Sequence, residues 1–370
     1  MVVGVAGALA AFIMPLLVTI SSEVFHLSTA SAGRVMAAEM FGFAAGSVAI
    51  ALLLSRTTIS RLMIATLLIT LACDALTNEH NTLIIFPLRF AAGLGEGGAV
   101  AAMTAVFANT TAPGRYYALY LCSSFLAATV IYRSATLIAR MASTHAIYWV
   151  LAVVALLALP AAVLARRSAM TNENHGTWKR VQKRRTKLIA AALASITAYL
   201  AAWTTMWTYA VNIGLWAGLS LQSCDIVLGN AMFAGLAGAA AAAVLGSRLG
   251  NFVPLLAAGT TMALAAFIIA LKLTPSTYPI AILLWMGGMQ FALPFLVAVM
   301  SDADSRGSAA SISLAAQMIG ISIGPALGAA VIGDGSASVL ASLSLALLIP
   351  SLATMLAAAK LLSHQRSQVT

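Results

Sequence analysis

Arg89 and Glu96 are ionisable residues within residues 86–98, a stretch that is otherwise apolar and rich in glycine. Their spacing (96 − 89 = 7) is close to two turns of an α-helix, so both side chains should project from one face. A charge near the centre of a bilayer costs a few kcal/mol or more. An acid and a base that share such a face therefore indicate a pathway for an ion or a solute. A static ion pair that locks two helices together is the competing interpretation.

Glu39, Arg89, Glu96 and Arg133 are the ionisable residues that fall deep within predicted apolar segments. We expect Glu96 to carry a proton, because burial disfavours a charged carboxyl and a nearby guanidinium favours it. Arg89 is the expected fixed partner, since arginine stays protonated. Glu39 could be a second proton site or the partner of Arg89 or Arg133. Arg133 could bind an anionic group of a substrate, or extend toward the membrane surface with Arg140.

The second half of the sequence offers neutral polar and aromatic residues instead of charges. We expect Asp74 to lie in a loop, and we expect no ionisable residue in the second half at comparable depth. Besides Arg133, the candidates for substrate binding are Trp203, Trp207, Asn230, Gln290 and Gln317. The two tryptophans are four residues apart and should share a helical face, where they could stack on a flat solute or face lipid. Gln290 could bind substrate or only pack its helix.

The composition places the chain in a membrane. Hydrophobic residues make up 61% and charged residues 8%, whereas about 25% of residues are charged in soluble domains. Mean hydropathy is +0.97. The net charge of +10 is concentrated in a few segments, which argues against nucleic acid as a partner. The three cysteines are scattered, and no metal-ligand spacing occurs, so we expect free thiols and neither a metal nor a cofactor.

Apolar runs long enough to span a bilayer as helices occur throughout the chain, and no run shows the alternation of a membrane barrel. They predict twelve transmembrane helices over residues 4–21, 31–54, 62–78, 83–108, 117–140, 147–165, 188–211, 225–246, 252–272, 278–300, 308–332 and 337–360. The fold class is thus an all-α polytopic membrane protein. Its predicted parts are a six-helix bundle (1–165), a basic linker (166–187) and a second six-helix bundle (188–370).

The distribution of basic residues predicts the orientation. Most of the 20 lysines and arginines fall in the linker, the tail and alternate loops, which places both termini in the cytoplasm. The first apolar run has no basic leader and no small-residue cleavage pattern, so we expect it to be retained as a span.

The two halves of the chain repeat one another. Ser55-Arg56 follows the second span and Ser247-Arg248 follows the eighth, an offset of 192 residues (248 − 56). Arg115 and Arg306 precede the fifth and eleventh spans at an offset of 191 (306 − 115). Such a repeat predicts two bundles related by a pseudo-two-fold axis, with a solute site between them near the midplane.

With this organisation the chain resembles the major facilitator superfamily, in particular its prokaryotic twelve-helix members. The best local match is Arg89-Phe-Ala-Ala-Gly93-Leu-Gly95, which is similar to a fourth-helix motif that the family associates with proton-coupled transport. The family's motif between helices two and three survives only in part, because Ser55 stands where the motif has an aspartate. The latch that depends on that carboxylate is therefore in question.

A second departure concerns the Gly-Pro motif that many exporters of the family carry on helix five. This chain has Tyr132-Arg133 at that place, and its Gly-Pro lies instead on the eleventh helix as Gly324-Pro325 (324 − 132 = 192). We expect Pro325 to kink that helix. The absence of the helix-five motif weakens a drug/proton antiport interpretation.

The glycines around Glu96 need a separate interpretation. Gly93, Gly95 and Gly98 formally satisfy the dinucleotide pattern G-x-G-x-x-G. That pattern requires a preceding strand in a βαβ unit, which is not predicted here. Close packing of helices through small residues explains these glycines better.

The resemblance implies a secondary active transporter that moves a small organic solute by alternating access, coupled to protons, with export favoured over import. A ligand-sensing or assembly protein on the same scaffold, without net transport, is the alternative. No enzyme signature is present. The expected setting is the bacterial plasma (inner) membrane, and the expected state is a monomer whose partners are the solute, protons and lipid.

Overall fold

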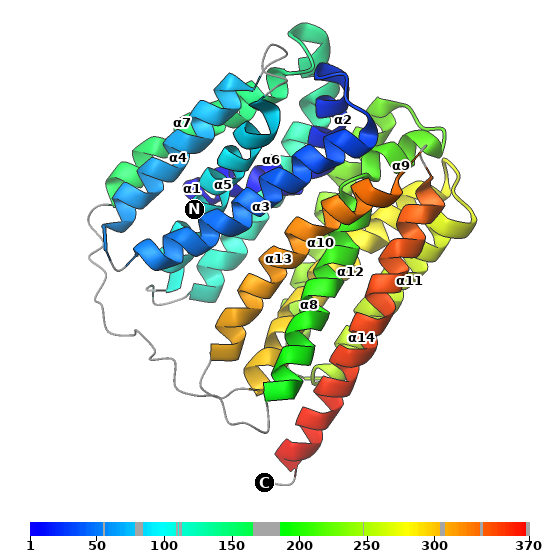
Figure 1. The fold of residues 1–370 in the computed structure, drawn as a ribbon. Helices are drawn as coiled ribbons and strands as arrows, with labels where there is room; N and C mark the ends of the chain where they lie inside the picture. Colours follow the sequence, from blue (N-terminus) through cyan, green and yellow to red (C-terminus); the bar gives the residue numbers. More distant parts are fainter. Residues whose placement is uncertain are drawn as a thin grey trace.

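The computed structural model describes residues 1–370 except 55, 78–83, 109, 111–112, 166–185, 247, 304–307, 334–335 and 368–370. The described residues form fourteen α-helices and no strand (Figure 1). The helices are α1 (Val2–Phe12), α2 (Met14–Val24), α3 (Thr29–Leu53), α4 (Ile59–Leu76), α5 (Ile85–Ala108), α6 (Pro113–Met141), α7 (Ala146–Leu164), α8 (Thr186–Trp207), α9 (Ala210–Trp216), α10 (Leu221–Leu245), α11 (Phe252–Leu271), α12 (Thr277–Ala303), α13 (Ser308–Val331) and α14 (Ala337–Ser367).

These helices confirm the twelve predicted spans, since each apolar run coincides with one helix or with a broken pair. In the described chain, ten helices are long and apolar enough to cross a membrane alone, and α1 with α2 forms one further span. The helix α13 supplies the eleventh predicted run, and α8 with α9 supplies the seventh. The predicted linker lies outside the described residues apart from its last two, which begin α8.

The first span of each half is divided into two pieces. The helices α1 and α2 meet at an angle of 63° around Ile13. Pro15 explains this break, because it has no N–H to donate to the carbonyl of Ala11 and its ring crowds the preceding turn. In the second half, Thr208 and Tyr209 separate α8 from α9.

Equivalent helix caps provide structural evidence for the internal repeat. Ser28 caps α3 by accepting a hydrogen bond from the backbone N–H of Ser31 at 3.2 Å. Ser220 caps α10 by accepting one from Ser223 at 3.2 Å. Both pairs are separated by the same 192 residues (220 − 28 and 223 − 31). The second helix of one half thus begins as the second helix of the other does.

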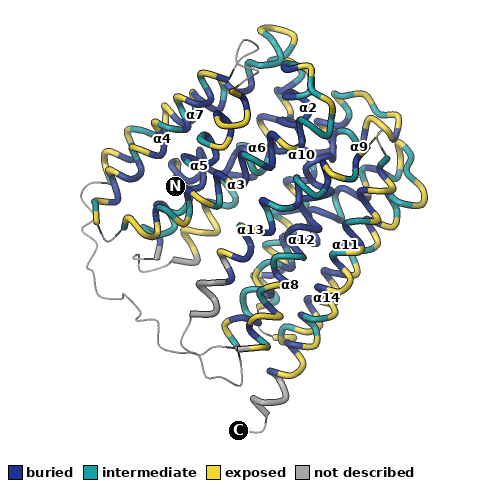
Figure 2. Tube along the Cα trace, viewed as in Figure 1, coloured by how far each residue is buried: buried dark blue, intermediate teal, exposed yellow. Residues whose placement is uncertain are grey.

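The two halves form two bundles that lie side by side (Figure 1). In the first half, α5 packs against α1, α3 and α4, and α4 also packs against α7. In the second half, α8 packs against α13 and α14, and α12 against α10 and α11. Three pairs join the halves: α3 with α13, α6 with α10, and α2 with α9. Buried residues line the faces where the helices meet, and exposed residues lie on the periphery (Figure 2).

Hydrogen bonds between the halves reach the middle of the bundles. Ser322 of α13 donates from its Oγ to the backbone oxygen of Met40 in α3 at 2.7 Å. Thr129 of α6 donates to the backbone oxygen of Gly229 in α10 at 3.4 Å. These bonds join the two halves at α3 with α13 and at α6 with α10.

Candidate functional site

Backbone contact between α3 and α5 positions the charged residues of the first half. A Cβ added at Gly93 would overlap the backbone oxygen of Glu39, and one added at Gly42 would overlap that of Phe90. Gly95 faces the neighbouring helix α4, where a Cβ would lie 2.6 Å from the backbone oxygen of Thr66. The small residues therefore bring α3, α4 and α5 into close contact, as proposed from the sequence.

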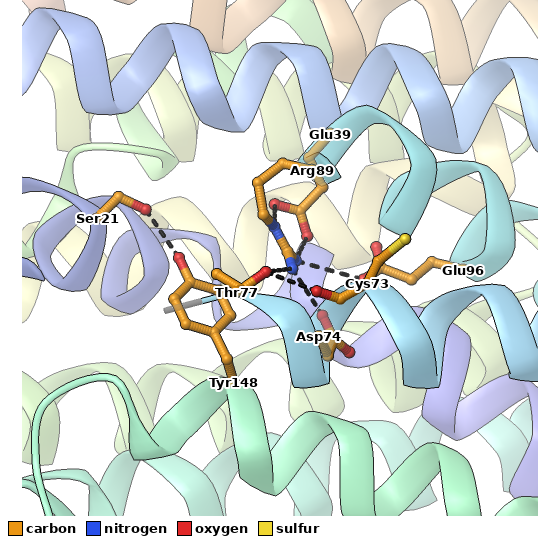
Figure 3. A network of polar contacts seen from close by, with 8 residues as sticks. All are labelled: Ser21, Glu39, Cys73, Asp74, Thr77, Arg89, Glu96 and Tyr148. Carbon is orange, nitrogen blue, oxygen red and sulfur yellow. Dashed lines mark hydrogen bonds and ion pairs between the residues drawn. The ribbon is translucent and has the colours of Figure 1, made fainter. Parts of the chain in front are cut away.

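Arg89 occupies the centre of this contact region and is surrounded by three acidic residues (Figure 3). Its Nε donates to Oε2 of Glu39 at 3.1 Å, and its Nη2 pairs with the second oxygen of the same carboxylate. Its Nη1 donates to Oδ1 of Asp74 at 2.6 Å. Glu96 lies farther away, with its Oε1 at 3.7 Å from Nη2. Glu39 is therefore the bidentate partner of Arg89 and not of Arg133.

Two further helices complete the surroundings of the guanidinium. The Arg89 Cζ lies 4.8 Å from the ring centroid of Tyr148 in α7, a cation–π distance. The hydroxyl of Tyr148 shares a hydrogen bond of 2.8 Å with Ser21 of α2. Thr77, directly after α4, receives a hydrogen bond of 3.4 Å from Nη1. Five helices thus hold one cation, which is buried completely.

The cluster contains more acid than base. If Glu39, Asp74 and Glu96 are all ionised, one guanidinium faces three carboxylates, and the net charge is 1 − 3 = −2. All of these side chains are buried. Oδ2 of Asp74 and Oε2 of Glu96 have no hydrogen-bond partner among the described residues. Burying uncompensated charge is costly, so proton binding is the chemistry that this arrangement favours.

Asp74 is a correction to the sequence analysis, which placed it in a loop. It lies in the last turn of α4 and is buried against Arg89. The predicted span 62–78 includes Asp74, and its place near the end of that span led to its assignment to the loop, because a predicted helix boundary carries an error of several residues. Its spacing from Arg89 gave no signal, since the two residues lie on separate helices.

Asp225 is a second correction, because no buried acid was expected in the second half. The predicted span began at residue 225, whereas α10 begins at Leu221 and buries Asp225 in its second turn. Oδ2 of Asp225 accepts a hydrogen bond from Thr136 in α6 at 2.9 Å. The four-residue error in the helix start is what concealed this residue.

Arg133 does not join the Arg89 cluster. It is exposed on α6, where its Nη2 donates to Oδ1 of Asn230 in α10 at 2.6 Å. The structure thus brings together two of the predicted substrate-binding residues, one from each half.

The remaining candidates lie in the second half. Trp203 and Trp207 share a helical face, as predicted, and their rings stack on each other with centroids 6.1 Å apart and planes 8° apart. Both are buried, which contradicts a lipid-facing position. Trp285 donates from its indole N–H to the backbone oxygen of Trp203 at 3.2 Å. Gln290 on α12 and Gln317 on α13 are also buried.

Gly324 and Pro325 lie within α13, where it packs on α8. A Cβ at Gly324 would overlap Oγ1 of Thr204, and the backbone oxygen of Pro325 accepts a hydrogen bond from Tyr209 at 3.0 Å. This segment is therefore fixed against the broken first span of the second half.

The geometry defines a class of protein: a helical membrane protein of two six-helix halves, with a buried cluster of one guanidinium and three carboxyls in the first half. In the described chain, no group of three or more His, Cys, Asp or Glu residues is arranged to hold a metal ion. The guanidinium of Arg89 takes the central place among the three carboxyls.

Comparison with known proteins identifies the family. The family model of the Major Facilitator Superfamily matches residues 1–325, so the chain belongs to this superfamily. No curated protein matches the chain. Among solved structures, the crystal structure of a D-xylose-proton symporter is similar with a TM-score of 0.72 and 13% sequence identity, covering 96% of this chain and 95% of that one. This likeness supports the shared twelve-helix fold. The chain is an integral membrane protein of a transporter family and not an enzyme.

Proposed function

We propose that the chain is a proton-coupled secondary transporter of a small organic solute, and that Glu96 is its proton carrier. The observation that carries the proposal is the set of three buried carboxyls around one buried guanidinium. A neutral cluster requires two of the three carboxyls to hold protons, and release of these protons requires a change in surroundings. A cycle in which the bundles rearrange supplies such a change.

Glu96 is the acid that Arg89 holds least strongly. Glu39 engages the guanidinium through both oxygens, and Asp74 lies at 2.6 Å. Glu96 is at 3.7 Å, beyond ordinary hydrogen-bond distance, and its second oxygen has no partner among the described residues. Because Glu96 and Arg89 both lie on α5, a change of side-chain rotamer is sufficient to separate or join Glu96 and the guanidinium. Glu96 binds a proton when it is separated from Arg89 and releases it when the ion pair forms.

Glu39 and Arg89 act in this scheme as the fixed part of the cluster. Their bidentate pair is held by the backbone contact at Gly93, so it moves as one unit with α3 and α5. Arginine suits this place because it keeps its charge throughout the cycle. Asp74, on α4, forms an ion pair with the same guanidinium.

The solute site in this proposal lies between the bundles. Gln290 and Gln317 supply amide groups on α12 and α13, and the Arg133–Asn230 hydrogen bond joins the two halves beside this site. Trp203 and Trp207 support the wall of the site by stacking on each other. Neutral amides in such numbers favour a neutral or zwitterionic solute that offers hydroxyl or amide groups.

We also propose the bacterial plasma membrane as the location, with both termini in the cytoplasm, and a monomer as the working unit. The basic residues of the loops support this orientation. Export is the direction we favour from the sequence. A ligand-sensing protein without net transport is the alternative.

A test in proteoliposomes separates these possibilities. Solutes are first screened by thermal shift at two pH values, beginning with D-xylose, and those that stabilise the protein are followed as radiolabelled probes. An acid lumen should drive accumulation by an exporter that exchanges protons for solute, and an acid exterior should drive accumulation by a symporter. A sensor would bind the probe and accumulate none under either gradient.

Glu96→Gln is the variant that tests the carrier. It should abolish accumulation driven by a pH gradient and preserve exchange of labelled for unlabelled solute, because the amide keeps the shape of the side chain and cannot release a proton. Glu23→Gln is the matched control: this acid is exposed at the end of α2, and its variant should accumulate solute normally. Normal accumulation by Glu96→Gln would refute the assigned role.

A further inference from the structure

A cavity of about 330 Å³ lies between α6 and α10, separate from the Arg89 cluster. Most of its lining surface is apolar, and its polar side chains are Arg133, Thr136 and Arg140 of α6 and Gln222 and Asp225 of α10. Because α6 belongs to the first half and α10 to the second, a molecule bound here would contact both halves.

The charged groups of this cavity do not satisfy one another. Asp225 is buried, and its Oδ1 has no hydrogen-bond partner among the described residues, while Oδ2 accepts a hydrogen bond from Thr136. Arg133 donates to the neutral side chain of Asn230 at 2.6 Å. Within the described part of the chain, neither Arg133 nor Arg140 forms an ion pair. The cavity therefore contains two guanidinium groups and one carboxyl oxygen that each lack a charged partner.

The cavity lies beside exposed apolar residues near the ends of α6 and α10, which the predicted topology places toward one membrane surface. Leu137 and Ile226, which also line it, are large apolar residues with exposed fractions of 57% and 39%. Arg140 is one residue from the end of α6, and Gln222 is one residue from the start of α10. Arg133 lies eight residues from that end of α6 (141 − 133), or about 12 Å at 1.5 Å per residue. Polar groups therefore extend from the headgroup level into the adjoining leaflet.

From these observations we propose that the cavity binds the headgroup of a phospholipid that carries a phosphate and a primary ammonium group, as in phosphatidylethanolamine. The phosphate lies between Arg133 and Arg140, because guanidinium groups bind phosphate oxygens through paired N–H donors. The ammonium group donates a hydrogen bond to Oδ1 of Asp225. The acyl chains follow the apolar surface beside Leu137 and Ile226.

Charge explains why a zwitterion fits better than an anion. The anionic headgroup of phosphatidylglycerol satisfies the two arginines, but it offers Oδ1 of Asp225 only a neutral hydroxyl donor and no cation. A trimethylated headgroup has the positive charge and no N–H to donate. Glu23 of α2 and Asp225 both line a second, small cavity of about 30 Å³, so Glu23 adds negative charge on that side, which further favours a cation there. The lipid bridges the two halves where α6 and α10 meet.

Native mass spectrometry of the full chain in detergent tests this proposal. The protein is titrated with phosphatidylethanolamine, phosphatidylcholine and phosphatidylglycerol of matched acyl chains, and with soluble glycerophosphoethanolamine. We expect about tenfold tighter binding of phosphatidylethanolamine than of the other two lipids, since one charge-assisted hydrogen bond distinguishes them. Tight binding of glycerophosphoethanolamine alone would identify a soluble zwitterion as the ligand and overturn the lipid assignment.

Two variants assign the contacts. Arg140→Gln should weaken the binding of all three lipids about tenfold each, because all three carry the phosphate. Asp225→Asn should remove the preference for phosphatidylethanolamine over phosphatidylcholine and leave phosphatidylglycerol unchanged. The matched control is Arg115→Gln, which removes an exposed arginine near the other end of α6 and should change none of these affinities.

Three results would overturn the proposal: equal affinity for the three lipids, equal losses in Arg140→Gln and Arg115→Gln, or an unchanged lipid preference in folded Asp225→Asn. If Asp225→Asn fails to fold, the lipid comparison in the unmodified protein and the pair of arginine variants still decide the outcome.

Discussion

Replacing Arg89 by methionine tests whether the buried guanidinium holds the first half together. The substitution keeps a long side chain in the space between α3, α4 and α5 and removes the charge. Glu39 loses both of its bonds, and Asp74 loses its bond of 2.6 Å. Tyr148 loses the cation 4.8 Å from its ring. The three acids remain buried without a cation.

The expected loss follows from these contacts. Removing one partner of a buried ion pair costs about 3–5 kcal/mol, because an uncompensated charge stays behind. For a large chain, each kcal/mol lowers the melting temperature by about 2 °C. Arg89→Met should therefore melt about 6–10 °C below the unmodified protein. Arg133→Met is the matched control: Arg133 is exposed and donates only to a neutral amide, so the loss should be about 1–3 °C.

The loss should also depend on pH. Without Arg89, the buried carboxyls become neutral by binding protons, so the folded state holds more protons than the unfolded state. The free energy of unfolding then falls as pH rises, because the folded state must bind these extra protons from a solution that contains fewer of them. The deficit of Arg89→Met relative to the unmodified protein should accordingly be larger at pH 8 than at pH 5.5. Arg89→Lys should recover part of the stability and still impair transport, since an ammonium group cannot bind Glu39 through a planar fork.

The assay is thermal unfolding of the purified protein in detergent, followed by tryptophan fluorescence at several pH values. Two results would refute the reasoning. One is a loss in Arg89→Met no greater than that in Arg133→Met at pH 8. The other is a deficit that stays constant between pH 5.5 and pH 8.

Two further predictions concern packing and the contact between halves. Gly93→Ala should destabilise the protein by about 1–3 kcal/mol, because the new methyl group overlaps the backbone oxygen of Glu39. Thermal unfolding measures this loss. Gly287→Ala is the control: its new Cβ has its nearest neighbour at 3.3 Å, so this variant should lose less stability. Ser322→Ala removes the hydrogen bond of 2.7 Å from Ser322 to the backbone oxygen of Met40. The conformation in which α3 and α13 are in contact should lose about 1 kcal/mol of stability, so its population relative to conformations in which they separate should fall about fivefold. Spin labels on the ends of α3 and α13 would show this as a larger fraction of long distances, and an unchanged distribution would contradict it.

Much of the architecture followed from the sequence because the bilayer imposes strict local requirements. Every backbone N–H and C=O group that crosses lipid must be paired within its own segment, so an apolar run of sufficient length becomes a helix. The runs therefore gave all twelve spans. The offset of 192 residues between the loop arginines Arg56 and Arg248 marked the two halves, and the caps Ser28 and Ser220 repeat it. Pro15 broke the first span, and the sequence analysis did not anticipate this.

The sequence predicted only part of the site. Arg89, Glu96 and Glu39 stood out because charge inside an apolar run is costly and needs a reason. Asp74 and Asp225 lie close to helix ends, where sequence patterns locate boundaries poorly. Both were missed for that reason.

The sequence by itself determined that this chain spans a membrane as two repeated sets of helices, because hydropathy and helix length are local properties of the chain. It also singled out a charged helix face at Arg89 and Glu96. Tertiary structure alone decided that Arg89 pairs with both oxygens of Glu39, that Asp74 joins them, and that Glu96 stands at 3.7 Å. Glu39 and Asp74 come from other helices than Arg89, and no spacing along the chain records how closely two helices approach. The distance between two helices depends on which glycines of one helix contact the backbone of the other. Among the three acids, Glu96 is the one that the guanidinium holds most weakly.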